Sequence, residues 1–136
     1  MKKSILVLLS ILFYFTSFCQ PYKSSLKALN EYLKVFNPET YRDIEVKDST
    51  VHFKFVYYTQ VYETRIGIKE LKQNTTVGKV NFFGTDEIKI ICNNKSKCFY
   101  SNFSKENVDH FRFFSKTVND LSKIEELVSK FIKSLK

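Results

Sequence analysis

Apolar and polar residues alternate along the middle of the chain with the period of two that is typical of half-buried strands. In the clearest segment, Val51, Phe53 and Phe55 alternate with His52 and Lys54. Short polar breaks separate such segments, and they favour antiparallel hairpins because parallel strands need long crossover connections. We therefore expect seven antiparallel strands, at residues 42–47, 51–58, 62–69, 79–83, 88–92, 97–101 and 110–115.

A leucine-rich segment with helical spacing precedes the strands. Leu29 and Leu33 fall on the apolar face of a helix that we expect over residues 22–37. Ser24 and Ser25 are its candidate capping residues, because serine side chains accept hydrogen bonds from the first backbone N–H groups. A proline follows directly and disfavours helix at the residue before it, so the helix is expected to end there.

The clearest helix is expected at the C-terminal end, over residues 117–136. Thr117 and Asp120 resemble a capping box, in which a carboxylate follows the capping hydroxyl by three residues. The apolar stripe of this helix is continuous and consists of Val118, Leu121, Ile124, Leu127, Val128, Phe131, Ile132 and Leu135. Such a basic amphipathic helix could lie on a membrane or bind a partner groove. We instead expect it to cover the sheet, whose apolar face needs a packing partner.

These patterns predict one α+β domain over residues 20–136, built on an antiparallel, bent sheet of about seven strands. Seven short strands followed by one long helix resemble the pleckstrin-homology-like superfold, here from Arg42 to Lys136. That resemblance implies a bent barrel plugged at one end by the closing helix. Its phosphoinositide sites do not carry over, because the first hairpin, 47–50, holds a single cation. The chain is also similar to small exported bacterial proteins that place a Leu-rich helix before such a module.

The segments that carry this second similarity are 64–71 and 88–92. A cystatin-like or nuclear-transport-factor-like arrangement, with a leading helix on a curved sheet, is the alternative fold. The long closing helix argues against that alternative.

The first nineteen residues have the composition of a secretory signal peptide. Lys2 and Lys3 precede an apolar run over residues 5–14, which is shorter than the ~20 residues of a membrane-spanning helix. We expect cleavage after Cys19, which leaves residues 20–136 as an exported domain, secreted or periplasmic. A lipid anchor on Cys19 is the alternative, although bulky Phe18 occupies a position where a lipoprotein signal needs a small residue.

Removal of the leader leaves Cys92 and Cys98 as the two cysteines. An oxidising compartment favours a disulfide between them. Residues 93–97 are polar and read as a turn between two strands, so we expect this bond to pin a hairpin. Metal binding would need further His or Cys residues nearby, and a redox-active pair typically has a two-residue spacer. No metal site is therefore predicted here.

A catalytic reading depends on the two histidines, His52 and His110. A ribonuclease-like pair would use them as base and acid, with Lys54 or Lys89 holding a phosphate. Each histidine alternates with apolar residues in a predicted strand, so each is expected on a polar face. The sequence has no Gly-rich phosphate loop, nucleophile motif or cofactor motif. No catalytic or cofactor residue is assigned, and a small secreted hydrolase is the alternative function.

The charge balance favours a binding role. Loss of Lys2 and Lys3 with the leader lowers the formal net charge from +8 to +6, which attracts anionic partners. Alternating cations are expected to gather on one sheet face with tyrosines between them: Lys54, Arg65, Lys69, Lys89 and Arg112. Such a face is also typical of nucleic-acid platforms, but export argues against that role. The prediction is a non-enzymatic binding module for an anionic surface or a protein partner.

Two adjacent phenylalanine pairs give the best sequence indication of an interface. Phe82–Phe83 and Phe113–Phe114 must each point to opposite faces of a strand. One member of each pair is therefore expected to be exposed or to be covered by the N-terminal helix. Exposed aromatic side chains that gather in a patch are typical of partner or ligand sites.

Overall fold

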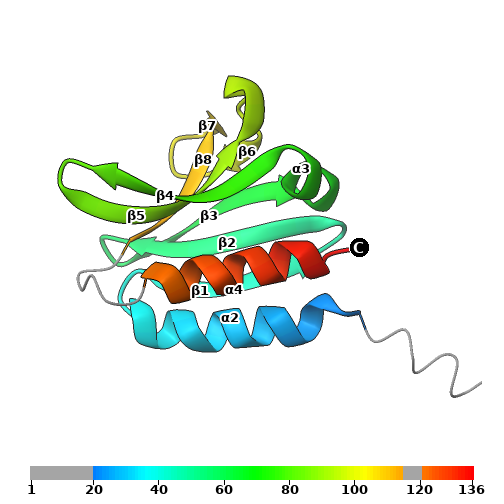
Figure 1. The fold of residues 1–136 in the computed structure, drawn as a ribbon. Helices are drawn as coiled ribbons and strands as arrows, with labels where there is room; N and C mark the ends of the chain where they lie inside the picture. The colour runs from blue at the N-terminus through cyan, green and yellow to red at the C-terminus, as the bar shows by residue number, and fades with distance from the viewer. Residues whose placement is uncertain (1–19, 115–120) are drawn as a thin grey trace, which may run out of the picture.

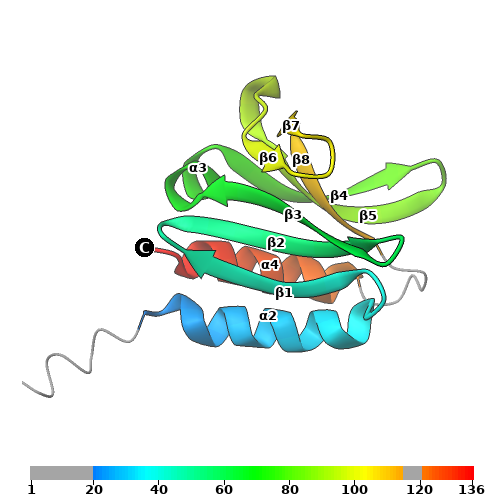
Figure 2. The same ribbon diagram turned by 180° about the vertical axis from the view of Figure 1, so that it is seen from behind.

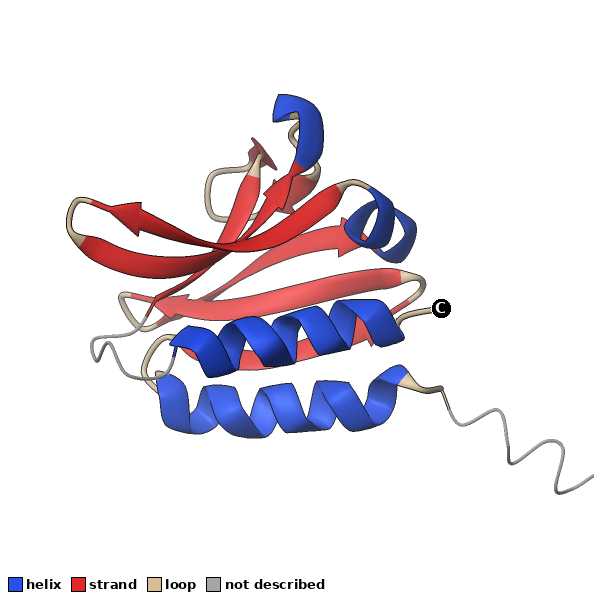
Figure 3. Cartoon of the chain, in the orientation of Figure 1, coloured by secondary structure: helices blue, strands red, loops and turns tan. Residues whose placement is uncertain are grey.

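The structure is a computed structural model that describes residues 20–114 and 121–136. The expected leader at residues 1–19 lies outside the described residues, and with it the alternatives at Cys19. Thr117 and Asp120, the expected capping box, lie outside them as well. Two helices and two antiparallel sheets dominate the described part of the chain (Figure 1, Figure 3).

Eight strands form the two sheets. The five-stranded sheet has the order β1-β2-β3-β6-β7, and the three-stranded sheet has the order β4-β5-β8. Their bounds are β1 Tyr41–Lys47, β2 Thr50–Tyr57, β3 Gln60–Gly67, β4 Thr75–Phe82, β5 Thr85–Cys92, β6 Phe99–Ser101, β7 Glu106–Val108 and β8 His110–Phe114. The helices are α2 Tyr22–Phe36, α3 Ile68–Gln73 and α4 Leu121–Ser134, with a short 3-10 turn η1 at Asn93–Lys95. The α+β class, the antiparallel pairing and the two flanking helices are confirmed.

Three details of the strand prediction are wrong. The sheets are not closed into a barrel, which differs from the bent barrel that the resemblance implies. An eighth strand, β7, occupies a polar stretch expected to be a break, because backbone pairing with β6 does not require apolar side chains. The end of the third expected strand forms helix α3, in which Leu71 is fully buried.

The N-terminal helix begins at Tyr22, as expected, but the two serines lie inside it and not at its cap. Pro21 stands at the N-cap position with φ −61°, and proline is favoured at helix starts because its φ already suits the helix. Ser25 lies inside α2, where its hydroxyl donates to the carbonyl of Tyr22 and lies 2.6 Å from the hydroxyl of Ser134. Ser24 and Ser25 therefore do not cap α2, and Ser25 instead ties the start of α2 to the end of α4.

The two helices lie side by side and antiparallel, next to the five-stranded sheet (Figure 1, Figure 2). α4 contacts β4 and β5 as well as α2, whereas α2 contacts β1. Six residues of the expected stripe are buried: Leu121, Ile124, Leu127, Val128, Phe131 and Leu135. The prediction that this stripe covers a sheet is confirmed.

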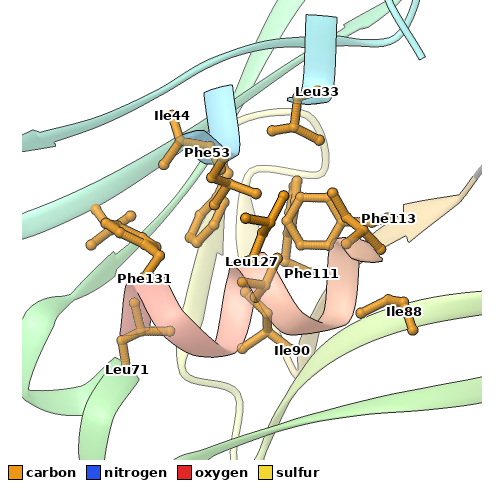
Figure 4. Packing of buried hydrophobic residues seen from close by; sticks show 14 of the residues in the cluster. Leu33, Ile44, Phe53, Leu71, Ile88, Ile90, Phe111, Phe113, Leu127 and Phe131 are labelled. Carbon is orange, nitrogen blue, oxygen red and sulfur yellow. The ribbon is translucent and has the colours of Figure 1, made fainter. Parts of the chain in front are cut away.

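The hydrophobic core lies between α4 and the inner faces of both sheets (Figure 4). Phe53 of β2 is stacked on Phe111 of β8 with ring centroids 4.6 Å apart, and it contacts Phe99 edge to face. Ile88 and Ile90 of β5 are fully buried on the face that meets α4. The strand alternation therefore placed the correct residues inside, because one face of each sheet is covered.

Candidate functional site

An apolar cleft of about 560 Å³ lies between β8 and the five-stranded sheet. It is lined by Thr40, Tyr41, Phe55, Val56, Tyr57, Thr64, Ser101, Phe103, Ser104, Val108, His110, Phe111, Arg112 and Phe114. An apolar cavity with a few polar groups is the usual form of a ligand site. We call this hollow the aromatic cleft.

Aromatic side chains form one wall of the aromatic cleft. Phe103, in the turn between β6 and β7, meets Tyr62 and Tyr57 edge to face, with centroids 4.8 and 5.2 Å away. Phe55 lies 6.4 Å from Phe103 and also 6.4 Å from Phe111 on the opposite sheet. Tyr57 and Phe103 are each 48% exposed, so part of this aromatic surface is open to an arriving ligand.

The polar groups of the aromatic cleft are few. Thr64 and Ser101 are directly paired between β3 and β6, and both are buried, so two hydroxyls lie side by side in its floor. Arg112 is the one side chain in the lining with a permanent charge. Its guanidinium lies over the Phe114 ring at 5.6 Å and 3.7 Å from the Glu87 carboxylate, and the side chain is half exposed. The cleft therefore presents one cation beside an aromatic wall, and the carboxylate paired with this cation, Glu87, lies outside the lining.

Tyr41 holds the β8 side of the cleft in place. Its hydroxyl donates to the carbonyl of Arg112 at 3.1 Å and accepts from the backbone N–H of Phe114 at 2.8 Å. Burial raises the pKa of the Tyr41 hydroxyl above its usual value, so this group stays protonated and able to donate. Sequence reasoning missed Tyr41, because nothing local distinguishes it from any other apolar residue at the start of a strand.

The disulfide joins the end of β5 to the residue before β6, outside the lining of the aromatic cleft. Cys92 and Cys98 are bonded, but β5 and β6 belong to different sheets, so the bond does not pin a hairpin as expected. It spans the crossover from β5 to β6, the second of the three points at which the chain passes between sheets. The third crossover, from β7 to β8, meets it there, since the N–H of Cys92 donates to the carbonyl of Asp109 at 2.8 Å.

We expect the disulfide to stabilise the fold by about 2 kcal/mol, the value for a short closed loop in the chain-entropy estimate. A Cys92→Ser, Cys98→Ser double variant should lose about this much free energy of unfolding in urea titrations. Dithiothreitol provides the control, because it should lower the wild type to the level of the variant and leave the variant unchanged. Equal stability of the oxidised wild type and the variant would contradict this role.

The structure does not bring the two histidines together in one cavity. His52 lines a separate polar groove of about 460 Å³ on the outer face of the five-stranded sheet, and its Nδ1 lies 3.0 Å from Glu63. His110 lines the aromatic cleft, with its Nδ1 2.6 Å from Asp109. This contact holds the pKa of the Asp109 carboxyl below its ordinary value. The ribonuclease-like arrangement gains no support from this geometry.

The two lysines proposed to hold a phosphate are engaged elsewhere. Lys54 binds Glu45 at 2.6 Å, and hydrogen bonds from Lys47 and Lys54 lower the pKa of that carboxyl to about 2. Lys89 lies 3.7 Å from the Glu87 carboxylate and 5.1 Å from the centroid of the Phe82 ring. Lys54 does not line the groove that contains His52, and Lys89 does not line the aromatic cleft that contains His110.

The expected gathering of cations on one sheet face is wrong. Lys54 and Arg65 lie on the five-stranded sheet, whereas Lys89 and Arg112 lie on the three-stranded sheet and Lys69 lies in α3. The reason is that successive hairpins of the chain are divided between two sheets. Arg65 does stack on a tyrosine, with its guanidinium 4.7 Å from the centroid of the Tyr100 ring.

The phenylalanine pairs behave differently from each other. Phe113 is fully buried, and Phe114 is half-buried beside Tyr41 at the rim of the aromatic cleft. Phe82 and Phe83 are both exposed at the tip of the β4–β5 hairpin, with Phe83 94% exposed. The N-terminal helix covers neither of them, because the β4–β5 hairpin lies on the far side of the sheets from α2 (Figure 1).

No group of three or more His, Cys, Asp or Glu side chains suited to a metal ion occurs in residues 20–114 and 121–136. None of the helices described is long and apolar enough to cross a membrane. No protein-family model, curated protein or solved structure matches the chain. The aromatic cleft is therefore interpreted from its own geometry.

Proposed function

We propose that the protein is an exported, non-enzymatic binding module and that the aromatic cleft is its ligand site. The observation that carries this proposal is the cleft itself, a hollow of about 560 Å³ with an aromatic wall and one cation at its rim. The disulfide supports export, because such bonds persist in oxidising compartments. A ligand with an apolar body and a negative group would complement this lining.

Arg112 supplies the polar part of this recognition. A hydrogen bond between charged groups contributes about 1.5–3 kcal/mol, so loss of the guanidinium should weaken an anionic ligand roughly tenfold or more. The aromatic rings around it contribute apolar contact area. In this cleft, apolar contact contributes affinity, and the charge of Arg112 contributes selectivity for anionic ligands.

The test uses the anionic aromatic dye 8-anilinonaphthalene-1-sulfonate, whose fluorescence rises in apolar sites. We expect saturable binding to the folded protein and roughly tenfold weaker binding to an Arg112→Gln variant. Arg65→Gln is the matched control, because Arg65 also stacks on an aromatic ring from an exposed strand position but lines the other groove. Its dye affinity should equal that of the wild type.

Two results would contradict the proposal. One is the absence of saturable dye binding to the folded protein. The other is an equal loss of affinity in Arg112→Gln and Arg65→Gln, which would indicate that the dye senses net charge and not the cleft. Thermal unfolding of both variants confirms that each remains folded during the titration.

A further inference from the structure

β8 is paired on one side only, and the hydrogen-bond pattern shows which of its backbone groups face the other side. It lies at the edge of the three-stranded sheet, next to β5. The N–H of Cys92 donates to Asp109, and hydrogen-bonded pairs alternate along an antiparallel ladder. The backbone groups of Phe111 and Phe113 therefore point towards β5. The backbone groups of His110, Arg112 and Phe114, which alternate with them, point to the open edge.

Three of the six groups on this open edge have partners. Tyr41 binds the carbonyl of Arg112 and the N–H of Phe114, and the Asn37 side-chain amide donates to the carbonyl of Phe114 at 3.3 Å. The N–H and C=O of His110 and the N–H of Arg112 have no hydrogen-bond partner among the described residues. His110 and Arg112 both line the aromatic cleft. The open stretch of strand edge is therefore inside the candidate ligand site.

Unpaired edge groups in an apolar cleft are unfavourable unless a ligand or water completes them. We propose that the aromatic cleft receives an extended, acidic peptide segment of a protein partner, which adds as a strand to the free edge of β8. This inference rests on the proposed function and names the ligand class of the same site. Strand addition takes its affinity from main-chain hydrogen bonds and its selectivity from pockets for alternate side chains.

The surroundings of the edge define the peptide. Tyr41 and Asn37 close the edge at Phe114, and the crossover at Asp109 ends it on the other side, so only a short stretch can pair. Side chains of an added strand alternate between two faces. Those facing the five-stranded sheet would meet the aromatic wall, where apolar or aromatic residues fit. Those facing outward would lie beside Arg112, which favours Asp or Glu.

Charge also distinguishes a peptide from a second copy of this chain. Antiparallel pairing of two β8 edges would bring Arg112 of each copy close to Arg112 and His110 of the other. Like charges on neighbouring strands destabilise the pairing. An acidic peptide replaces this repulsion with an ion pair.

The experiment pans a phage library of random dodecapeptides against the purified protein, with Arg112→Gln protein for counter-selection. Enriched peptides should alternate apolar and acidic residues. Hydrogen exchange by NMR should then show at least tenfold slower exchange of the His110 and Arg112 amides when the best synthetic peptide binds. N-methylation of the peptide at its edge-facing amides should weaken binding at least tenfold.

The opposite edge of the same sheet supplies the control amides. The N–H of Asn93 donates to Asn74, so the backbone groups of Val77 and Lys79 on β4 point away from β5. Their exchange should be unaffected by the peptide. A general slowing that includes Val77 and Lys79 would mean global stabilisation, and it would overturn strand addition.

The remaining outcomes show whether strand addition alone or the ligand site as well is wrong. Dye binding that depends on Arg112, without enriched peptides or without protection of the His110 and Arg112 amides, would overturn strand addition and leave the ligand site intact. Absence of both dye and peptide binding would overturn both. Slower exchange that depends on protein concentration alone, with dimers in sedimentation, would assign the edge to a second copy and overturn the peptide.

Discussion

Replacement of Phe53 by Ala should lower the free energy of unfolding by about 3–5 kcal/mol, the cost of removing a buried aromatic side chain. Phe53 is 1% exposed and its ring contacts three further phenylalanines, Phe99, Phe111 and Phe113. These partners come from both sheets, so a cavity at Phe53 would remove contact between the sheets as well as within one. Urea titrations followed by circular dichroism measure the loss.

Phe83→Ala is the matched control for this prediction. It removes the same atoms from a ring that is 94% exposed at a hairpin tip. Surface substitutions of this kind usually change stability by no more than about 0.5 kcal/mol. A loss below about 1 kcal/mol for Phe53→Ala, or similar losses for both variants, would show that Phe53 does not hold the two sheets together.

The residues of the core could be predicted because they depend on local periodicity. The alternation around Phe53 and the helical stripe that contains Phe131 each identify a buried face without knowledge of its partner. The disulfide was also predictable, from the cysteine count and the oxidising compartment that the expected leader implies. These inferences need only the residue types and their spacing along the chain.

The pairing of strands could not be predicted in this way. β5 and β6 are successive strands, yet they belong to different sheets, and no local pattern records that separation. β7 has three residues, which is too short for a period of two to be recognised. The first two residues of the helix Ile68–Gln73 were assigned to the end of a strand, because a short apolar run suits both forms.

The candidate site was harder still, because it exists only where the two sheets diverge. Arg112 was identified as a cation from sequence, but its position beside the cleft depends on the edge location of β8. Tyr41 lies 71 residues from its hydrogen-bond partner, Arg112, along the chain. Glu87 is a charged residue in β5, yet the structure buries it. Long-range packing decides each of these three cases.

Burial of Glu87 leads to the second large effect. Its side chain is 7% exposed, and its carboxylate lies 3.7 Å from both Lys89 and Arg112. Lys89 is itself 12% exposed, so removal of the carboxylate would leave an ammonium largely shielded from water without its ion-pair partner. Breaking a buried pair in this way costs about 3–5 kcal/mol, and we expect about 3 for Glu87→Gln because Arg112 is half exposed.

A double variant distinguishes the effect of an unpaired buried charge from that of a simple packing defect. Replacing both members of a buried ion pair by neutral groups of similar size is often close to neutral, since neither charge then needs compensation. Lys89→Met added to Glu87→Gln should therefore recover most of the lost stability in the same urea titrations. If the double variant is no more stable than Glu87→Gln alone, the unpaired ammonium is not the cause, and loss of the contact between Glu87 and Arg112 would account for the effect.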